Sequence, residues 1–170
     1  ESLSLPPVAE PPKGERLKNK VVLLTGAAQG IGEAIVATFA AQQAKLIISD
    51  IQAEKVEKVA AYWREQGADV VAIKADVSRQ QDLHAMARLA VDLHGRIDVL
   101  VNCAGVNVFR DPLEMTEEDW HRCFAIDLDG AWYGCKAVLP QMIEQGIGSI
   151  INIASTHSSH IIPGCFPYPV

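Results

Sequence analysis

The feature that most constrains the fold is a regular alternation between short apolar segments and longer segments with helical periodicity. In one of the longer segments, Val56, Val59, Ala60 and Trp63 recur at the spacing of an amphipathic helix. Short apolar runs that alternate with such helices predict βαβ crossovers, and therefore a doubly wound α/β fold with a parallel sheet covered on both faces. The five predicted strands are Val21–Leu24, Lys45–Ser49, Asp69–Lys74, Asp98–Asn102 and Gly148–Ile153.

Helices are predicted between these strands. The first runs from about Gly32 to Gln43. Ser78 and Gln81 form the pattern of a capping box, which predicts the start of the third helix. The last helix is long, from Thr116 to about Glu144, and we expect a kink near Pro140 because proline cannot complete the helical hydrogen bonds.

The two ends of the chain depart from this pattern. Residues 1–16 contain a cluster of prolines and predict an extended N-terminal arm, because proline lacks the N–H that helices and inner strands use. Residues 17–170 then form one domain, as a length of 170 residues suggests. The first residue is Glu1 rather than Met, and Tyr168-Pro169 predicts a new helix just before Val170. We therefore expect the domain to be incomplete at its C-terminus.

Composition excludes several classes of function. Fifteen basic and 21 acidic residues give a net charge of −6, whereas nucleic-acid and acidic-membrane binders need a basic face. The longest apolar runs are far shorter than the roughly 18 residues of a membrane span, and no signal-peptide pattern opens the chain. We expect a soluble, cytoplasmic protein without nucleic-acid or membrane partners.

Cysteine and histidine spacing does not predict a metal site. The cysteines contain no C-x-x-C pair, so neither a zinc site nor a disulfide framework is expected, and we interpret all of them as reduced. His157 and His160 lie close together without a third ligand, which is weak evidence for a metal. We therefore expect no metal. The cysteines are Cys103, Cys123, Cys135 and Cys165.

A glycine-rich segment follows the first predicted strand, with Gly26, Gly30 and Gly32 in the pattern G-x-x-x-G-x-G. Gly26 permits a tight turn, Gly30 lets the backbone approach a pyrophosphate, and Gly32 lets the following helix pack closely on the sheet. The spacing differs from the commoner G-x-G-x-x-G, and such spacings also occur in plain turns. Combined with the βαβ pattern, the motif predicts a Rossmann-like dinucleotide site.

Asp50 follows the second predicted strand, where a dinucleotide-binding fold places an acid that accepts hydrogen bonds from the adenosine ribose. A carboxylate there would repel the 2′-phosphate of NADP, and no Arg or Lys lies in residues 27–29 or beside Asp50 to bind one. NAD is therefore favoured as the cofactor. The alternative is that Asp50 only caps the end of the strand.

Several motifs together carry a resemblance to a known family. Thr25–Gly32, Asp76-Val77, Asn102-Cys103-Ala104-Gly105, and Ser155 with the later Tyr168 resemble the short-chain dehydrogenase/reductase family, over nearly all of residues 20–170. The resemblance implies that Asp76 and Val77 contact the adenine, and that the segment after the fourth strand borders the cofactor. The candidate cofactor-binding residues are Gly26, Gln29, Gly30, Ile31, Gly32, Asp50, Ile51, Asp76, Val77, Asn102, Ala104 and Gly105.

The same resemblance places Ser155 and Tyr168 on the catalytic serine and tyrosine of the family. A base must remove the hydroxyl proton of the substrate, and a tyrosine, with an ordinary pKa of about 10, needs nearby positive charge for this role. The family supplies part of that charge with a lysine four residues after the tyrosine, a position beyond Val170. Ser155 would hold the substrate oxygen. Otherwise Ser155 is a turn residue and Tyr168 an aromatic residue near a frayed end.

Asp127 corresponds to the helix asparagine that supports a proton-relay water in the family. Aspartate keeps an acceptor oxygen, but it adds a charge and loses the amide donor. Its role therefore depends on whether the relay uses the side chain or the backbone carbonyl. We treat Asp127 as a candidate catalytic residue.

Polar residues predict the kind of substrate. Asn107 and Arg110 follow the fourth strand and His157 follows Ser155, so these residues face the crevice at the carboxyl ends of the strands. With Ser155 and Tyr168, Asn107 and His157 are the candidate substrate-binding residues; alternatively, this rim is solvated loop. We expect an NAD-dependent oxidoreductase that interconverts a hydroxyl and a carbonyl on a sugar or sugar acid, as the resemblance to sugar dehydrogenases also implies. The alternatives are an NADPH-dependent carbonyl or 3-oxoacyl reductase and a non-catalytic dinucleotide-binding fragment.

The long predicted helix carries more apolar surface than one packing face would use. Related enzymes use this helix to form dimers and tetramers, so the resemblance implies a homo-oligomer. The apolar residues concerned are Trp120, Phe124, Ala131, Trp132 and Val138.

Overall fold

Five strands form one parallel sheet in the computed structural model, which describes residues 11–160 and 163–168. The strand order is β3-β2-β1-β4-β6, with β1 in the centre, and every neighbouring pair is parallel. The doubly wound α/β fold is therefore confirmed. The strands are β1 (Val21–Thr25), β2 (Lys45–Asp50), β3 (Asp69–Lys74), β4 (Val99–Asn102) and β6 (Ser149–Asn152).

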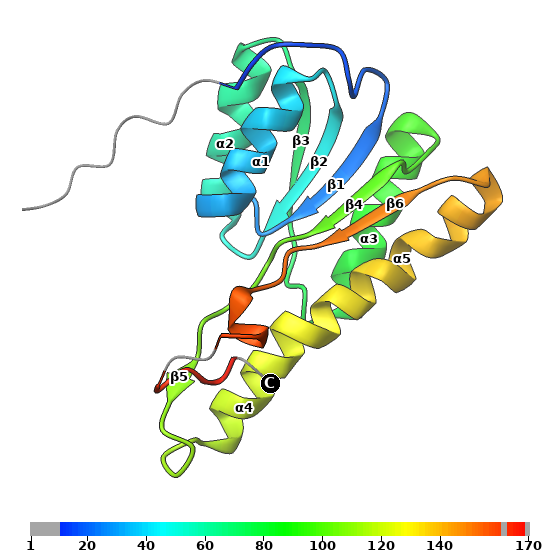
Figure 1. Cartoon of the computed structure of the whole chain (residues 1–170). Helices are drawn as coiled ribbons and strands as arrows, with labels where there is room; N and C mark the ends of the chain where they lie inside the picture. Colours follow the sequence, from blue (N-terminus) through cyan, green and yellow to red (C-terminus); the bar gives the residue numbers. More distant parts are fainter. Residues whose placement is uncertain (1–10, 161–162, 169–170) are drawn as a thin grey trace, which may run out of the picture.

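Helices cover both faces of this sheet, as Figure 1 shows. α1 (Gly30–Ala41) and α2 (Ala53–Glu65) lie on one face, and α3 (Gln80–His94) and α5 (Gly130–Gln145) lie on the other. α1 begins two residues before the predicted start, because the glycine turn itself leads into the helix. Within the described ranges, no helix is both long enough and apolar enough to span a bilayer.

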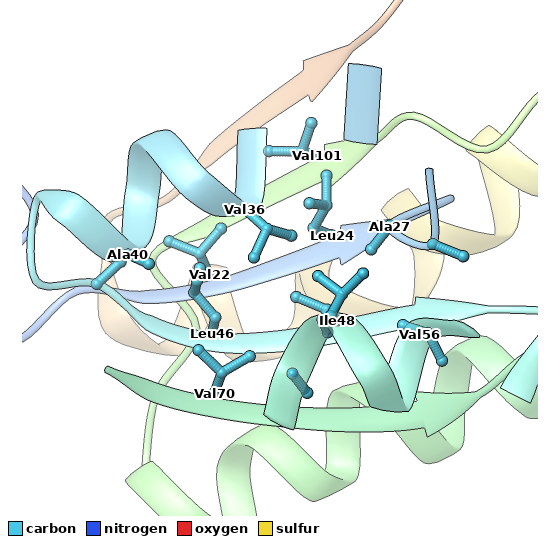
Figure 2. Close-up of a cluster of buried hydrophobic side chains, with 14 residues drawn as sticks. Val22, Leu24, Ala27, Val36, Ala40, Leu46, Ile48, Val56, Val70 and Val101 are labelled. Carbon is cyan, nitrogen blue, oxygen red and sulfur yellow. The ribbon is translucent and has the colours of Figure 1, made fainter. Parts of the chain in front are cut away.

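The hydrophobic core consists of two layers separated by the sheet. In β1, Val22 and Leu24 pack towards α1 and α2, whereas Val21 and Leu23 pack towards α3 and α5. Successive side chains of a strand point to opposite faces, so a central strand covered on both sides must be apolar throughout. Figure 2 shows the first layer, to which Val36 contributes from α1.

The long helix predicted from Thr116 is interrupted. α4 (Glu117–Phe124) begins after Thr116, whose hydroxyl oxygen accepts a hydrogen bond from the Asp119 amide at 3.1 Å. A π-helical segment, η1 (Ala125–Asp129), follows, and α5 then continues through Pro140. The hydrogen-bonding pattern of the long helix therefore changes at η1, while the predicted kink near Pro140 stays a prediction. Apolar periodicity does not reveal such segments, which are frequent at functional sites.

Two further details correct the sequence prediction. Ser78 donates hydrogen bonds from its amide and its hydroxyl to Asp76 Oδ1, at 3.0 and 2.6 Å, instead of forming a capping box with Gln81. β4 begins at Val99, one residue after the predicted start, and the buried Asp98 carboxylate accepts hydrogen bonds from the Val21 amide and from Arg96 Nε.

A second, two-stranded sheet joins segments that are distant in the sequence. β5 (Phe109–Arg110) pairs antiparallel with β7 (Phe166–Pro167). β5 lies between β4 and α4, and β7 follows a 3₁₀ turn, η2 (Thr156–Ser158). The sequence analysis predicts neither strand, because two residues are too few to show a period.

The described part of the predicted N-terminal arm packs against the domain. Gln42 Nε2 donates to the Pro12 carbonyl at 2.6 Å, and the Gly14 amide donates to the Ala41 carbonyl at 2.9 Å. This part therefore lies against the end of α1 rather than standing apart. Residues 1–10 of the arm and the helix expected from Pro169 lie outside the described residues.

Candidate functional site

A cleft of about 780 Å³ lies at the carboxyl ends of the parallel strands. In sheets of this topology ligands bind where the strand order reverses, which here is between β1 and β4. Most residues predicted for the site border this cleft. They are Gly26, Gln29, Gly30, Ile31, Gly32, Asp50, Ile51, Asp76, Val77, Ala104, Gly105, Asn107, Asp127, Ser155 and Tyr168.

The turn after β1 depends on close backbone packing. A Cβ atom at Gly26 would lie 2.7 Å from the Ala104 backbone, and one at Gly32 would lie 2.0 Å from the Gly26 carbonyl oxygen. By contrast, Gly30 has a φ of +59°, and its Cβ position would have no atom of the described residues within 4 Å. Gly30 therefore leaves open backbone at the start of α1. Unpaired helix-start amides in such a turn suit a pyrophosphate.

Thr25 connects this turn to the loop after β4. Its buried hydroxyl oxygen accepts hydrogen bonds from the amides of Cys103 and Ala104, at 3.1 and 3.2 Å. Burial raises the pKa of the Cys103 thiol. The sequence analysis assigns no separate role to Thr25, although a hydroxyl at the end of an otherwise apolar strand is the signal that could have found it.

Asp50 is buried at the end of β2, and both of its carboxylate oxygens accept hydrogen bonds from backbone amides. Oδ2 accepts from Ala28 at 3.0 Å, and Oδ1 accepts from Gln52 at 2.9 Å. Asp50 therefore ties the turn after β1 to the start of α2 while it lines the cleft. Asp50 therefore does cap the end of its strand, as the alternative interpretation expects. Its contact with a ribose stays a prediction.

Lys55 is a cation near this end of the cleft that the sequence analysis missed. Its Nζ donates to Gln29 Oε1 at 3.4 Å, and Gln29 lines the cleft. Lys55 is not a sequence neighbour of Asp50, but the first turn of α2 brings it close to the glycine turn. Lys55 therefore places a positive charge beside Gln29, at the same end of the cleft as Asp50.

Asp76 and Val77 border the cleft after β3. Besides accepting from Ser78, Asp76 donates from its amide to Asp82 Oδ2 at 3.0 Å, which fixes the segment before α3. A Cβ atom at Gly130 would lie 2.9 Å from Val77 Cγ2. The start of α5 therefore packs directly on the residue predicted to contact adenine.

Asn102 is not among the residues that line the cleft, and its predicted role in the cofactor site stays a prediction. Its Nδ2 donates to Asn152 Oδ1 at 2.8 Å and to the Ala131 carbonyl at 3.2 Å, so it links β4 to β6 and α5. Gly134 leaves room for this side chain, since a Cβ there would lie 2.4 Å from Asn102 Oδ1. Asn102 therefore holds the sheet against α5.

Asp127 lies in η1 and reaches the loop after β4. Its Oδ1 accepts a hydrogen bond from the Val106 amide at 2.8 Å, and its Oδ2 accepts from the Cys123 thiol at 3.5 Å. Burial raises the pKa of Asp127. Burial and the nearby carboxylate raise the pKa of Cys123 to about 11. The Oδ1 contact therefore holds η1 to the loop after β4, and the Oδ2 contact joins η1 to the last turn of α4.

Ser155 and Tyr168 border the same cleft. Ser155 follows β6, and its Oγ accepts a hydrogen bond from the His157 amide at 3.2 Å at the start of η2. The Tyr168 ring lies edge-on to Phe109 and to His157, with ring centroids 6.0 and 5.7 Å apart. The fold thus brings the predicted serine and tyrosine to one site.

The predicted polar rim is only partly present. Asn107 borders the cleft, whereas Arg110 and His157 do not. Arg110 Nε donates to Asp119 Oδ2 at 3.0 Å, a contact that lowers the pKa of Asp119. The His157 ring lies beside that of Tyr168, and its predicted contact with the substrate stays a prediction.

Metal-ligating side chains do not gather in the part of the chain that the structure describes. No group of three or more His, Cys, Asp or Glu residues there could hold a metal ion. The four cysteines are free.

Comparison with known sequences gives a consistent assignment. The family model described as short chain dehydrogenase matches residues 20–169. The chain is 37% identical over 152 residues to an uncharacterized oxidoreductase of Thermotoga maritima, a match that covers 89% of this chain and 59% of that protein. It is 39% identical over 140 residues to the D-threitol dehydrogenase of Mycolicibacterium smegmatis, which covers 82% of this chain and 54% of that protein.

A solved structure extends the similarity to three dimensions. A short chain dehydrogenase/reductase from Burkholderia phymatum, in complex with NAD, aligns with a TM-score of 0.87 and 28% identity over 90% of this chain and 55% of that one. The chain therefore spans little more than half the length of these relatives. Because the family model covers both the glycine turn and Tyr168, the chain belongs to the short-chain dehydrogenase/reductase family.

Proposed function

We propose that this chain carries the cofactor-binding and catalytic residues of an NAD-dependent oxidoreductase that interconverts a hydroxyl and a carbonyl group on a small polar substrate. One observation carries the proposal: the glycine turn, Asp50, Ser155 and Tyr168 all border the same cleft. Family membership supports a nicotinamide dinucleotide as the cofactor.

The residues of the cleft fit NAD. The open backbone at Gly30 suits the pyrophosphate, and Asp50 lies where this fold binds the adenosine ribose. The Asp50 carboxylate would repel a 2′-phosphate, which favours NAD over NADP. When bound, NAD supplies the acceptor for a hydride from the substrate carbon.

Residues of this chain transfer the proton of the substrate hydroxyl. Tyr168 removes the proton from the substrate hydroxyl during oxidation and returns it during reduction, while Ser155 donates a hydrogen bond to the same oxygen. We assign Asp127 to a proton relay through its backbone carbonyl, while its side chain accepts hydrogen bonds from the Val106 amide and the Cys123 thiol.

A sugar, sugar acid or polyol is the proposed substrate class. Asn107 and Ser155 border the cleft and carry groups that both donate and accept hydrogen bonds, as a hydroxylated substrate requires. The similarity to a protein named D-threitol dehydrogenase supports the same class.

The test is to assay the full-length gene product with D-threitol, other polyols, aldoses and sugar acids, each with NAD and with NADP. We expect turnover with NAD, and a loss of about 10²-fold or more in Tyr168→Phe with little change in NAD affinity. A preference for NADP would contradict the cofactor assignment, and an active Tyr168→Phe enzyme would contradict the catalytic one.

We also propose a cytoplasmic homo-oligomer, either a dimer or a tetramer. Four exposed apolar side chains follow one side of η1 and α5: Leu128, Trp132, Leu139 and Ile143. This stripe differs from the surface predicted from sequence, because Val138 is 1% exposed and belongs to the core. The four free cysteines suit a reducing compartment.

A further inference from the structure

The ring of Tyr168 lies between two other rings that come from different parts of the chain. Phe109 belongs to β5, and His157 belongs to η2. Both meet the tyrosine edge-on, with interplanar angles of 90° and 74°. Such T-shaped pairs are the arrangement that aromatic rings favour, so these contacts restrict how the tyrosine ring can turn.

The two neighbouring rings are themselves anchored. β5 is fixed by its pairing with β7, in which Phe109 lies opposite Pro167, and by the ion pair between Arg110 and Asp119 of α4. β7 is fixed by Phe166, whose ring centroid lies 5.8 Å from that of Trp120 in α4. The Phe109 ring beside Tyr168 is therefore held by α4 and by the β5–β7 pairing.

His157 is anchored on the catalytic side. Its amide donates to Ser155 Oγ at 3.2 Å, so the serine and the ring beside the tyrosine are connected through one short turn. His157 Nδ1 is buried without a hydrogen-bond partner among the described residues. The contact of this side chain with Tyr168 is thus a packing contact between rings.

We propose that Phe109 and His157 are positioning residues that hold the Tyr168 ring at the angle needed for proton transfer. Both residues contact the tyrosine ring, and we assign them a role that acts through the tyrosine. The inference rests on the proposed function of Tyr168 as the catalytic base. Its physical basis is that proton transfer requires the hydroxyl within hydrogen-bond reach of the substrate, and a displacement of about 1 Å can cost about 10²-fold in rate.

Substitutions that remove or keep a ring separate positioning from simple packing. In the full-length gene product, Phe109→Ala and His157→Ala should each lower kcat by about 10-fold, while KM and NAD affinity change less than about twofold. Phe109→Tyr and His157→Phe keep a ring at each position and should restore most of the kcat. Leu113→Ala is the matched control, because Leu113 lies in the same connection after β4 but is 96% exposed.

A measurement that needs no substrate tests the ring contacts directly. In the full-length gene product labelled with 3-fluorotyrosine, this part of the chain contributes three ¹⁹F signals, from Tyr62, Tyr133 and Tyr168, and Tyr168→Phe identifies the one from Tyr168. Phe109→Ala and His157→Ala should shift or broaden that signal and leave those of Tyr62 and Tyr133 in place. Phe109→Tyr would add a fourth signal, so Leu113→Ala serves as the control here as well.

The outcomes are distinct. An unchanged Tyr168 signal in both alanine variants would overturn the proposed contacts. A shifted signal with wild-type kcat would overturn the positioning role alone. Full activity in Tyr168→Phe would overturn the proposed function, whatever the fluorine signals show.

Discussion

At the scale of single residues, several polar side chains that the sequence suggests for ligand binding also form hydrogen bonds that stabilise the fold. Asp50 was identified from its place after the second strand, and its hydrogen bonds to Ala28 and Gln52 add a structural role. Asn102 and His157 could not be placed from sequence, because the chain alone does not tell which way a side chain turns at a strand end or in a loop. Lys55 was missed because its proximity to Gln29 depends on the fold.

The charge of Asp127 should lower stability at neutral pH. Burial raises its pKa, so the folded chain binds this proton more tightly than the unfolded chain does. The resulting penalty is absent below the ordinary aspartate pKa and appears as pH rises through the raised folded value. Asp127→Asn keeps an acceptor for the Val106 amide and should raise Tm by about 2 °C at pH 7, since a half-exposed carboxyl is partly screened. Thermal unfolding at pH 7 and near pH 3 checks this, and an equal gain at both values would contradict it.

Cofactor preference should depend on both charges at the adenosine end of the cleft. Asp50→Ala with Ile51→Arg removes the repulsion and adds a cation, so the ratio of NADP to NAD affinity should rise by about 10-fold or more. The loss of two acceptors for backbone amides should also lower the free energy of unfolding by about 1–3 kcal/mol. Adding Lys55→Ala to this variant should weaken NADPH binding more than NADH binding. Fluorescence titration with NADH and NADPH measures both effects, and a wild-type chain that already prefers NADPH would contradict the role of Asp50.

At the scale of elements, apolar periodicity predicted the parallel strands and the helices on either side, because each of these elements buries a continuous face. It could not predict η1, where the helix changes its hydrogen bonding within one turn, or β5 and β7, which are too short for a period. The missed elements all border or support the side of the cleft that Ser155 and Tyr168 line. The interruption at η1 places Asp127 against Val106, and β7 places Tyr168 beside Phe109.

Small residues at the start of α5 should be required for its fit on the sheet. An alanine at Gly134 gains about 0.5–1 kcal/mol of helix propensity, but its Cβ would lie 2.4 Å from Asn102 Oδ1. The clash forces the Asn102 amide away from Asn152, and we expect Gly134→Ala to lower the free energy of unfolding by about 1–3 kcal/mol. Urea unfolding gives the measurement. A variant as stable as the parent chain would show that Asn102 can move without loss.

At the scale of the whole molecule, the exposed stripe of Leu128, Trp132, Leu139 and Ile143 predicts association of copies of this chain. Trp132→Glu with Ile143→Glu places charges in that surface and should shift the protein to monomers. Multi-angle light scattering at micromolar concentration checks this, with Tyr62→Glu as the control because Tyr62 is an exposed aromatic residue of α2 on the opposite face. Parent chain that is already monomeric would contradict the proposed assembly.

The strand order has a consequence for how the site comes into existence. β1, β2 and β3 are joined by short crossovers, so these three strands can pair early in folding. β1 pairs with β4, with Val22 opposite Val99, only after a much longer segment of chain closes into a loop. The cleft lies across the junction between β1 and β4. Thr25, at the end of β1, connects the two sides of this junction because its hydroxyl oxygen accepts hydrogen bonds from the Cys103 and Ala104 amides after β4. A sheet of β1, β2 and β3 alone would contain the glycine turn but would lack the residues after β4 and β6 that form the opposite wall of the cleft. If the proposed dinucleotide binds in this cleft, its binding should therefore report completed folding, and a folding intermediate that has only its first three strands should not bind the dinucleotide.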